Sequence, residues 1–169
     1  MRLLALYVAA TFAALAIQTI LPFWFPIQGF VPHLILILSV DLGLRHPSAP
    51  AALMAFAMGF ATDALSGSQV GLNAFTVTLV FLVSYEISGR LLATSDLVGA
   101  ITVFAGTLIN ALGAFLLAAN PMPWSQLQGA AGQRMLLQAA ITAVLAGPVF
   151  WLLRRGKSAL GLALRNARE

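Results

Sequence analysis

The chain has 169 residues, of which 60% are hydrophobic and only 8% are charged. Soluble domains carry roughly 25% charged residues, so this composition excludes an ordinary water-soluble domain. The absence of cysteine excludes disulfides, thiol nucleophiles and thiolate metal sites.

Proline, glycine and polar residues divide the chain into six apolar stretches. A membrane-spanning helix needs about 20 mostly apolar residues, so six spans leave no room for a soluble domain. We therefore expect an all-α, polytopic membrane protein with one domain and six transmembrane helices in one compact bundle. The predicted spans are residues 3–21, 31–44, 51–65, 70–92, 97–119 and 134–153, followed by a basic cytoplasmic tail at 154–169.

The first span has no small-residue cleavage site after it and is expected to remain as a helix that Pro22 ends. The second span is short. Part of the apolar connection before it, 23–30, is expected to lie at membrane depth, which is tolerated only under a cover of other helices. A Ser66–Gly67–Ser68 turn separates the third span from the fourth, and Pro148 predicts a kink in the sixth.

The distribution of basic residues predicts that both termini lie in the cytoplasm. Cytoplasmic loops of membrane proteins are enriched in Lys and Arg, and with both termini inside only Arg134 falls on the outer side. The other eight cations then lie inside: Arg2, Arg45, Arg90, Arg154, Arg155, Lys157, Arg165 and Arg168. The tail could also lie on anionic lipid as a short basic helix.

Small and polar residues recur at helical spacing on four spans, and such faces allow helices to pack closely in lipid. We expect these stripes to face other helices and the Leu, Val and Phe faces to contact lipid. The stripe on the first span is the best candidate for an external partner, because a terminal helix often lies at the edge of a bundle. The stripes are Ala5, Ala9 and Ala13; Ala55, Gly59 and Asp63; Gly99, Gly106 and Gly113; and Gln138, Thr142 and Ala146.

Two acidic residues near the inner ends of spans each precede a cation by four residues. Asp41 precedes Arg45, and Glu86 precedes Arg90, the favourable order for a salt bridge along a helix. We expect both pairs to satisfy their own charges at the membrane interface. Asp96 is expected to be an N-cap or first-turn acid of the fifth span.

Asp63 has no cation near it in sequence and lies on the small-residue face of the third span. We expect its carboxylate to accept hydrogen bonds from the backbone of the Ser66 to Ser68 turn and from Asn73, which would fix the angle between the third and fourth spans. The alternative is a ligand or proton site, since carboxylates inside membranes are often functional.

No arrangement of residues predicts catalysis or a cofactor. The two histidines, His33 and His46, are expected near opposite faces of the membrane, and a metal site needs several converging ligands. No phosphate-binding glycine loop or hydrolase signature is present. We expect neither an enzyme nor a metal, cofactor or nucleic-acid site.

The stretch from Gly59 to Ala74, GFATDALSGSQVGLNA, resembles the signature of the rod shape-determining protein MreD family. In that signature an Asp near the end of a span meets a Ser/Gly turn and then Gly-Leu-Asn-Ala. Pro32-His33-Leu34, the chain length and the basic C-terminus are also similar. The resemblance extends over essentially the whole chain, with its specific residues in spans two to four.

The resemblance implies a non-enzymatic scaffold in the bacterial inner membrane that belongs to the cell-elongation machinery. It implies binding to MreC, a single-span protein, and a connection to MreB filaments, to RodA and to a penicillin-binding transpeptidase. Candidate structural or partner residues are Asp63, Ser66, Gly67, Asn73, Ala9, Ala13 and Gly59, with a lateral groove between the small faces of spans one and three. The family is also similar in fold to the substrate-binding subunits of energy-coupling-factor vitamin transporters, which leaves such a subunit as the alternative.

Overall fold

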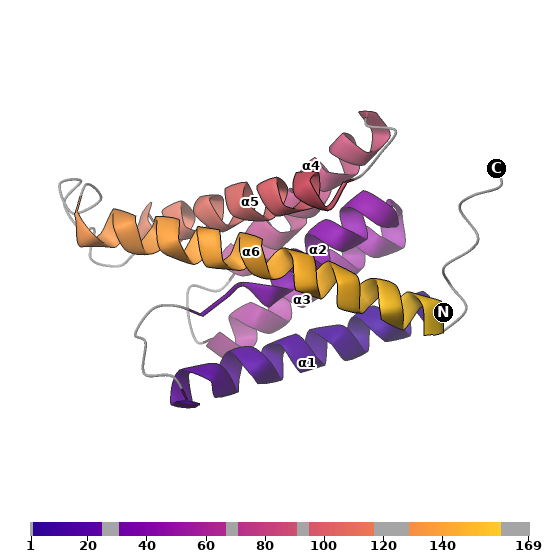
Figure 1. Cartoon of the computed structure of the whole chain (residues 1–169), viewed down its shortest axis with the longest axis horizontal. Coiled ribbons are helices and arrows are strands. Elements are labelled where there is room, and N and C mark those ends of the chain that lie inside the picture. The colour runs from indigo at the N-terminus through magenta and orange to yellow at the C-terminus, as the bar shows by residue number, and fades with distance from the viewer. Residues whose placement is uncertain (1, 25–30, 67–70, 91–94, 117–128, 160–169) are drawn as a thin grey trace.

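The computed structural model describes residues 2–24, 31–66, 71–90, 95–116 and 129–159 (Figure 1). Within these ranges the side chains of residues 2, 21–24, 66, 130, 131 and 159 lie outside the description. The described residues form six helices and no strand, which confirms the all-α prediction. The helices are α1 (Arg2–Trp24), α2 (Leu34–Arg45), α3 (Ala49–Ser66), α4 (Leu72–Arg90), α5 (Asp96–Leu116) and α6 (Ala130–Ala159).

Four of the described helices are long and apolar enough to cross a membrane. They are α1, α4, α5 and α6, while Ala49–Leu65 of α3 forms a shorter apolar helix. Helix α2 has only 12 residues, so it is about 18 Å long and cannot cross a hydrocarbon core of about 30 Å alone. Six spans and cytoplasmic termini therefore stay predictions.

Several helix boundaries differ from the predicted span ends. Helix α2, for example, begins at Leu34 rather than at residue 31. Helix α1 continues past Pro22 to Trp24, so the missing N–H of this proline, which removes one hydrogen bond in the last turn, does not end the helix. Helix α3 begins at Ala49, where the Ser48 hydroxyl accepts a hydrogen bond from the Ala51 N–H at 3.3 Å. Helix α6 continues through Pro148 to Ala159, so residues 154–159 of the predicted tail belong to a helix.

Helix α2 lies at the centre of the bundle. Every residue from Ile35 to Leu44 is buried, and α2 packs against each of the other five described helices. Its sequence is apolar on all sides, as expected for a helix with no exposed face. Around it, α3 packs mainly on α4 and α5 mainly on α6, while α1 lies along one side (Figure 1).

Many large apolar side chains are exposed and several charged side chains are buried, as expected for a protein in lipid. Large apolar side chains such as Phe12, Leu53 and Val144 are 70–74% exposed, whereas Asp41, Asp63 and Lys157 are almost fully buried. A protein folded in water would reverse both observations. The outer surface of the bundle is therefore suited to hydrocarbon, and its buried charged groups have polar or charged partners inside.

Small residues bring the helices into close contact. On α5, Gly99 lies against the Phe150 ring and Gly106 against Val80, and on α6 Thr142 and Ala146 are fully buried. The predicted stripes of spans five and six therefore face protein. Gly59 of α3 faces the backbone of α4 and has no room for a side chain.

We predict that Gly59→Ala lowers the free energy of unfolding by about 1–3 kcal/mol, the usual cost of overpacking. An added Cβ would lie 2.6 Å from the Asn73 carbonyl oxygen and 2.6 Å from the Ala74 Cα, and backbone atoms cannot rotate away. Thermal unfolding in detergent measures the change. The control is Gly147→Ala, since a Cβ there meets no atom within 4 Å. An equal effect at both positions would contradict the tight α3–α4 contact.

Candidate functional site

The non-helical segment before α2, residues 31–33, is held by side chains from both terminal helices. Gln18 of α1 donates a hydrogen bond from Nε2 to the Pro32 carbonyl at 2.8 Å, and Gln138 of α6 donates one to the Val31 carbonyl at 3.0 Å. Non-helical backbone at membrane depth requires such partners. Residues 31–33, which were predicted to begin the second span, instead precede α2 and are covered by α1 and α6. Residues 25–30 of the connection for which cover was expected lie outside the description.

His33 completes this cluster at the N-terminal end of α2. Its backbone N–H donates to the Thr142 hydroxyl at 3.4 Å, and its ring Nε2 lies 3.1 Å from Gln138 Nε2. His46 follows the other end of α2, so α2 separates the two histidines. No group of three or more His, Asp or Glu side chains within the described ranges is placed to hold a metal ion.

The Asp63 carboxylate caps the N-terminus of the neighbouring helix α4. Its two oxygens accept backbone hydrogen bonds from Gly71 at 3.0 Å, Asn73 at 3.0 Å and Ala74 at 2.9 Å. The first N–H groups of a helix have no partner within it and usually bind the side chain of the preceding residue. Here that residue is Gly71, which has no side chain, so Asp63 of α3 supplies the acceptor.

The cap continues into a buried polar chain that joins three helices. The Asn73 amide also donates to Asp63 at 2.9 Å, and Asn110 of α5 donates to the Asn73 side-chain oxygen at 2.8 Å. The hydrogen bond from Asn73 to Asp63 was predicted from the sequence. The contact of Asn110 with Asn73 was not predicted. Residues 67–70 lie outside the description, so Gly67 and the expected bonds from that turn are not placed, nor is the Ser66 side chain.

This geometry accounts for the sequence motif that begins the fourth span. Gly71 has a φ of +97°, a left-handed conformation that strains other residues. The N–H groups of Asn73 and Ala74 then point to Asp63, and Gly59 lets α3 approach them. Each of these residue types is thus required by the α3–α4 junction itself.

A second buried cluster lies near the C-terminal end of α2, around Asp41. This carboxylate accepts hydrogen bonds through Oδ2 from the Tyr7 hydroxyl of α1 at 2.5 Å and from Lys157 of α6 at 2.6 Å. Arg45 Nε lies 2.8 Å from Oδ1 and forms an ion pair with it. The N–H of Arg45 is not aligned with Oδ1, so this oxygen accepts no hydrogen bond from the described residues. One carboxylate on the central helix thus connects both terminal helices.

Asp96, in the first turn of α5, extends the ionic network. Its Oδ1 accepts a hydrogen bond from Arg45 at 2.8 Å and another from Arg154 of α6 at 2.8 Å. Arg45 therefore bridges the buried Asp41 and the half-exposed Asp96. The network links α1, α2, α5 and α6 at the end of the bundle where the N-terminus and the end of α6 lie (Figure 1).

The structure corrects two expectations about these charges. The Asp41–Arg45 pair exists, but it is not self-contained, because Asp41 is fully buried and also binds Tyr7 and Lys157. Lys157 belongs to α6 and is buried rather than part of a solvated tail. By contrast, the Glu86–Arg90 pair is local and exposed, with 3.6 Å between its charged atoms.

His46 lies beside this network, just after α2. Its ring packs edge-on against Tyr7 with centroids 6.4 Å apart. Burial lowers the pKa of His46, and the positive charge of Lys157 lowers that pKa further. The imidazole is therefore neutral near pH 7 and adds no further positive charge to the cluster.

The alanine face of α1, defined as Ala5, Ala9 and Ala13, is exposed and points away from the bundle. The opposite side of the helix carries the buried Tyr7 and Ala14. This stripe therefore does not pack within the described bundle, and its contact with an external partner stays a prediction.

The other half of the expected groove is closed. Ala55, Gly59 and Asp63 of α3 are buried, and Gly59 is in direct contact with α4. A partner groove between the small faces of α1 and α3 is therefore not open, which leaves the alanine face of α1.

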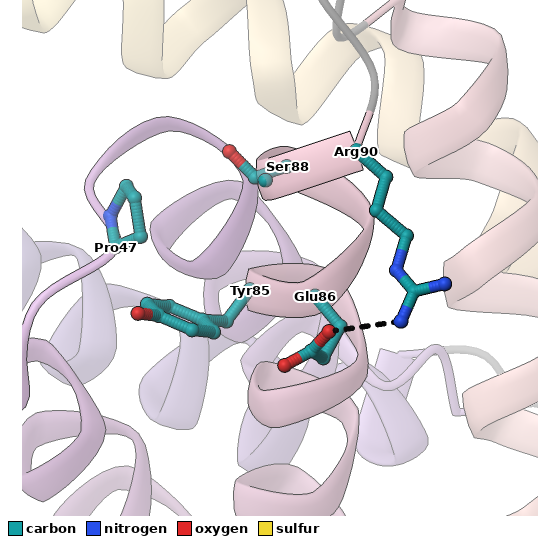
Figure 2. A pocket seen from close by; sticks show the side chains of 6 residues that line it. Pro47, Tyr85, Glu86, Ser88 and Arg90 are labelled. Carbon is teal, nitrogen blue, oxygen red and sulfur yellow. Dashed lines mark ion pairs between the residues drawn. The ribbon is translucent and has the colours of Figure 1, made fainter.

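A hollow of about 390 Å³ lies beside the C-terminal end of α4, on the same end of the bundle as the ionic network. Figure 2 shows Glu86 and Arg90 paired across one turn of α4, with Tyr85 directed toward Pro47. The lining residues are Pro47, Tyr85, Glu86, Ser88, Gly89 and Arg90.

The apolar exterior, the long apolar helices and the internal ionic clusters define a multi-pass α-helical membrane protein. The family model of the rod shape-determining protein MreD matches residues 1–156. The chain therefore belongs to the MreD family, which confirms the resemblance and supports a role in determining rod shape. No curated protein and no solved structure matches the chain.

We predict that Asp63→Leu lowers the yield and the thermal stability of the detergent-purified protein. The free energy of unfolding should fall by at least about 2 kcal/mol. Leucine accepts no hydrogen bond, so the first N–H groups of α4 and the Asn73 amide lose a buried acceptor. Asp63→Asn retains one acceptor oxygen and should give an intermediate loss. If Asp63→Leu is as stable as the parent, the carboxylate does not hold α3 against α4.

We predict that Asp41→Asn destabilises the protein by about 3–5 kcal/mol, because it leaves the buried Lys157 without its anionic partner. Lys157→Met should cost less, since Arg45 still pairs with Asp41. The double variant should lose less than the sum of the two. Unfolding curves in detergent test this, with the exposed Glu86→Gln as control. Strict additivity would show that Asp41 and Lys157 are not energetically coupled.

Proposed function

We propose that this chain is a non-enzymatic scaffold of the bacterial inner membrane, within the machinery of cell elongation and peptidoglycan synthesis. It binds the transmembrane helix of an MreC-type partner through the alanine face of α1. The observation that carries this proposal is the exposure of Ala5, Ala9 and Ala13 on the side of α1 opposite the bundle.

A small-residue face is suited to a helical partner for a physical reason. Apolar side chains gain little by leaving lipid for protein, so helices associate in membranes through close packing and hydrogen bonds. Alanines at four-residue spacing let a second helix approach the backbone of α1. The other small-residue stripes are used for contacts within the chain, as Gly59, Gly106 and Ala146 show.

The buried polar groups support a scaffold rather than a reaction centre. The Asp63 and Asp41 carboxylates are occupied by donors from neighbouring helices, and each cluster joins at least three helices. Such contacts stabilise one arrangement of the bundle, which then presents fixed surfaces to partners. RodA, its transpeptidase and MreB filaments are further partners that the family resemblance implies.

The placement of cations supports an orientation with both termini in the cytoplasm. Arg45, Arg90, Arg154, Arg155 and Lys157 all lie at or beyond helix ends that share one side of the bundle. Arg134 lies near the start of α6, at the opposite side. The positive-inside rule assigns the first side to the cytoplasm.

A vitamin-binding subunit has no observation in its favour. That alternative requires polar groups near Asp63, Asn73 and His33 that are directed to a ligand. Instead, Asp63 and Asn73 bind α4 and Asn110, and His33 binds Gln138 and Thr142 of α6.

We predict that Ala9→Leu and Ala13→Leu each reduce co-purification of an MreC-type partner on the order of tenfold, because overpacking a close contact costs about 1–3 kcal/mol. Both positions are exposed, so the bundle itself should retain its thermal stability. Pull-down from detergent-solubilised membranes measures the retained partner. Val144→Leu, at an exposed position on α6, is the matched control. Full retention by both α1 variants would remove α1 from the interface.

A further inference from the structure

Most cations at the C-terminal end of α6 and around it are matched by acidic residues. Arg45 and Lys157 pair with Asp41, Arg154 pairs with Asp96, and Arg90 pairs with Glu86. Within the part of the chain that the structure describes, Arg155 has no acidic partner. Its side chain is exposed, so its charge is available to an anion from outside these helices.

The position of Arg155 is fixed by an aromatic ring. Its guanidinium carbon lies 4.4 Å from the centroid of the Trp151 indole, one turn earlier on α6. Trp151 is 50% exposed and Leu152 beside it is 64% exposed, so this face of α6 is directed to lipid. Indole rings favour the boundary between hydrocarbon and headgroups, and the stacking holds the guanidinium at that depth.

We infer that Arg155 and Trp151 form a binding site for the phosphate of an anionic phospholipid. A guanidinium is planar and binds phosphate oxygens through two parallel N–H donors. The indole covers one face of the guanidinium and leaves its edge N–H groups for the phosphate, while the exposed Leu152 contacts the acyl chains. Arg134, the other described cation without an acidic partner, has no such ring contact and lies at the opposite end of α6.

Fluorescence quenching by brominated lipids tests this site directly. The chain has three tryptophans, so a full-length Trp24→Phe/Trp124→Phe background leaves Trp151 as the only tryptophan, which is excited selectively over the two tyrosines. This protein is reconstituted in phosphatidylcholine vesicles that contain brominated phosphatidylglycerol or, at equal bromine content, brominated phosphatidylcholine. The ratio of the two quenching constants reports which headgroup occupies the position beside Trp151.

We expect the anionic lipid to quench about fivefold more effectively, since one Arg near an anionic surface contributes about 1 kcal/mol. The ratio should fall to about one in Arg155→Gln, decrease at high salt and remain partly raised in Arg155→Lys, which retains the charge but not the planar donors. Arg134→Gln and the double variant Arg165→Gln/Arg168→Gln are matched controls that should leave the ratio unchanged.

Three results would overturn the inference. A ratio near one in the parent background means that no anionic lipid is held beside Trp151. If Arg155→Gln then also releases a co-purified protein, Arg155 binds a carboxylate of that protein instead. A raised ratio that survives Arg155→Gln shows that other groups attract the lipid. A ratio lost in the Arg165/Arg168 double variant assigns the lipid to the tail.

Discussion

Helix α2 has no exposed face, and this burial imposes the main requirement on the rest of the chain. Its ends carry polar groups that water would otherwise hydrate: the carbonyls of Val31 and Pro32 at one end and Asp41 at the other. The carbonyls bind Gln18 and Gln138, and Asp41 binds side chains from α1 and α6. An unsatisfied polar group in hydrocarbon costs several kcal/mol, so these contacts select one arrangement of the helices around α2.

The α3–α4 junction was the most predictable part of the protein. The sequence shows an Asp without a nearby cation, a glycine-rich turn and an Asn within a few residues, and local spacing suffices to bring Asp63 and Asn73 together. The role of Gly71 as a left-handed residue before α4 is also a local property. The helix class and the approximate positions of all six helices follow from apolar runs and prolines, which are local signals as well.

The contacts between distant helices could not be predicted from the sequence. Asp41 has a suitable cation four residues later, so nothing in the pattern indicates Tyr7 or Lys157 as additional partners. Lys157 follows two arginines and resembles a tail residue, and only the length of α6 shows that it reaches the bundle interior. Likewise, spacing identifies the stripes containing Ala9 and Gly59 equally well, but the packing of α3 on α4 decides that only the first is exposed.

The pairing of Asp41 with Lys157 also bears on how the protein is made. The two residues are 116 positions apart, and α6 leaves the ribosome last of the described helices. During synthesis, the carboxylate on α2 therefore has Tyr7 and Arg45 beside it long before the lysine exists. Until α6 docks, Asp41 therefore lacks one of its two cationic partners, and the buried centre of the bundle reaches its final charge balance only when synthesis of the last helix is complete.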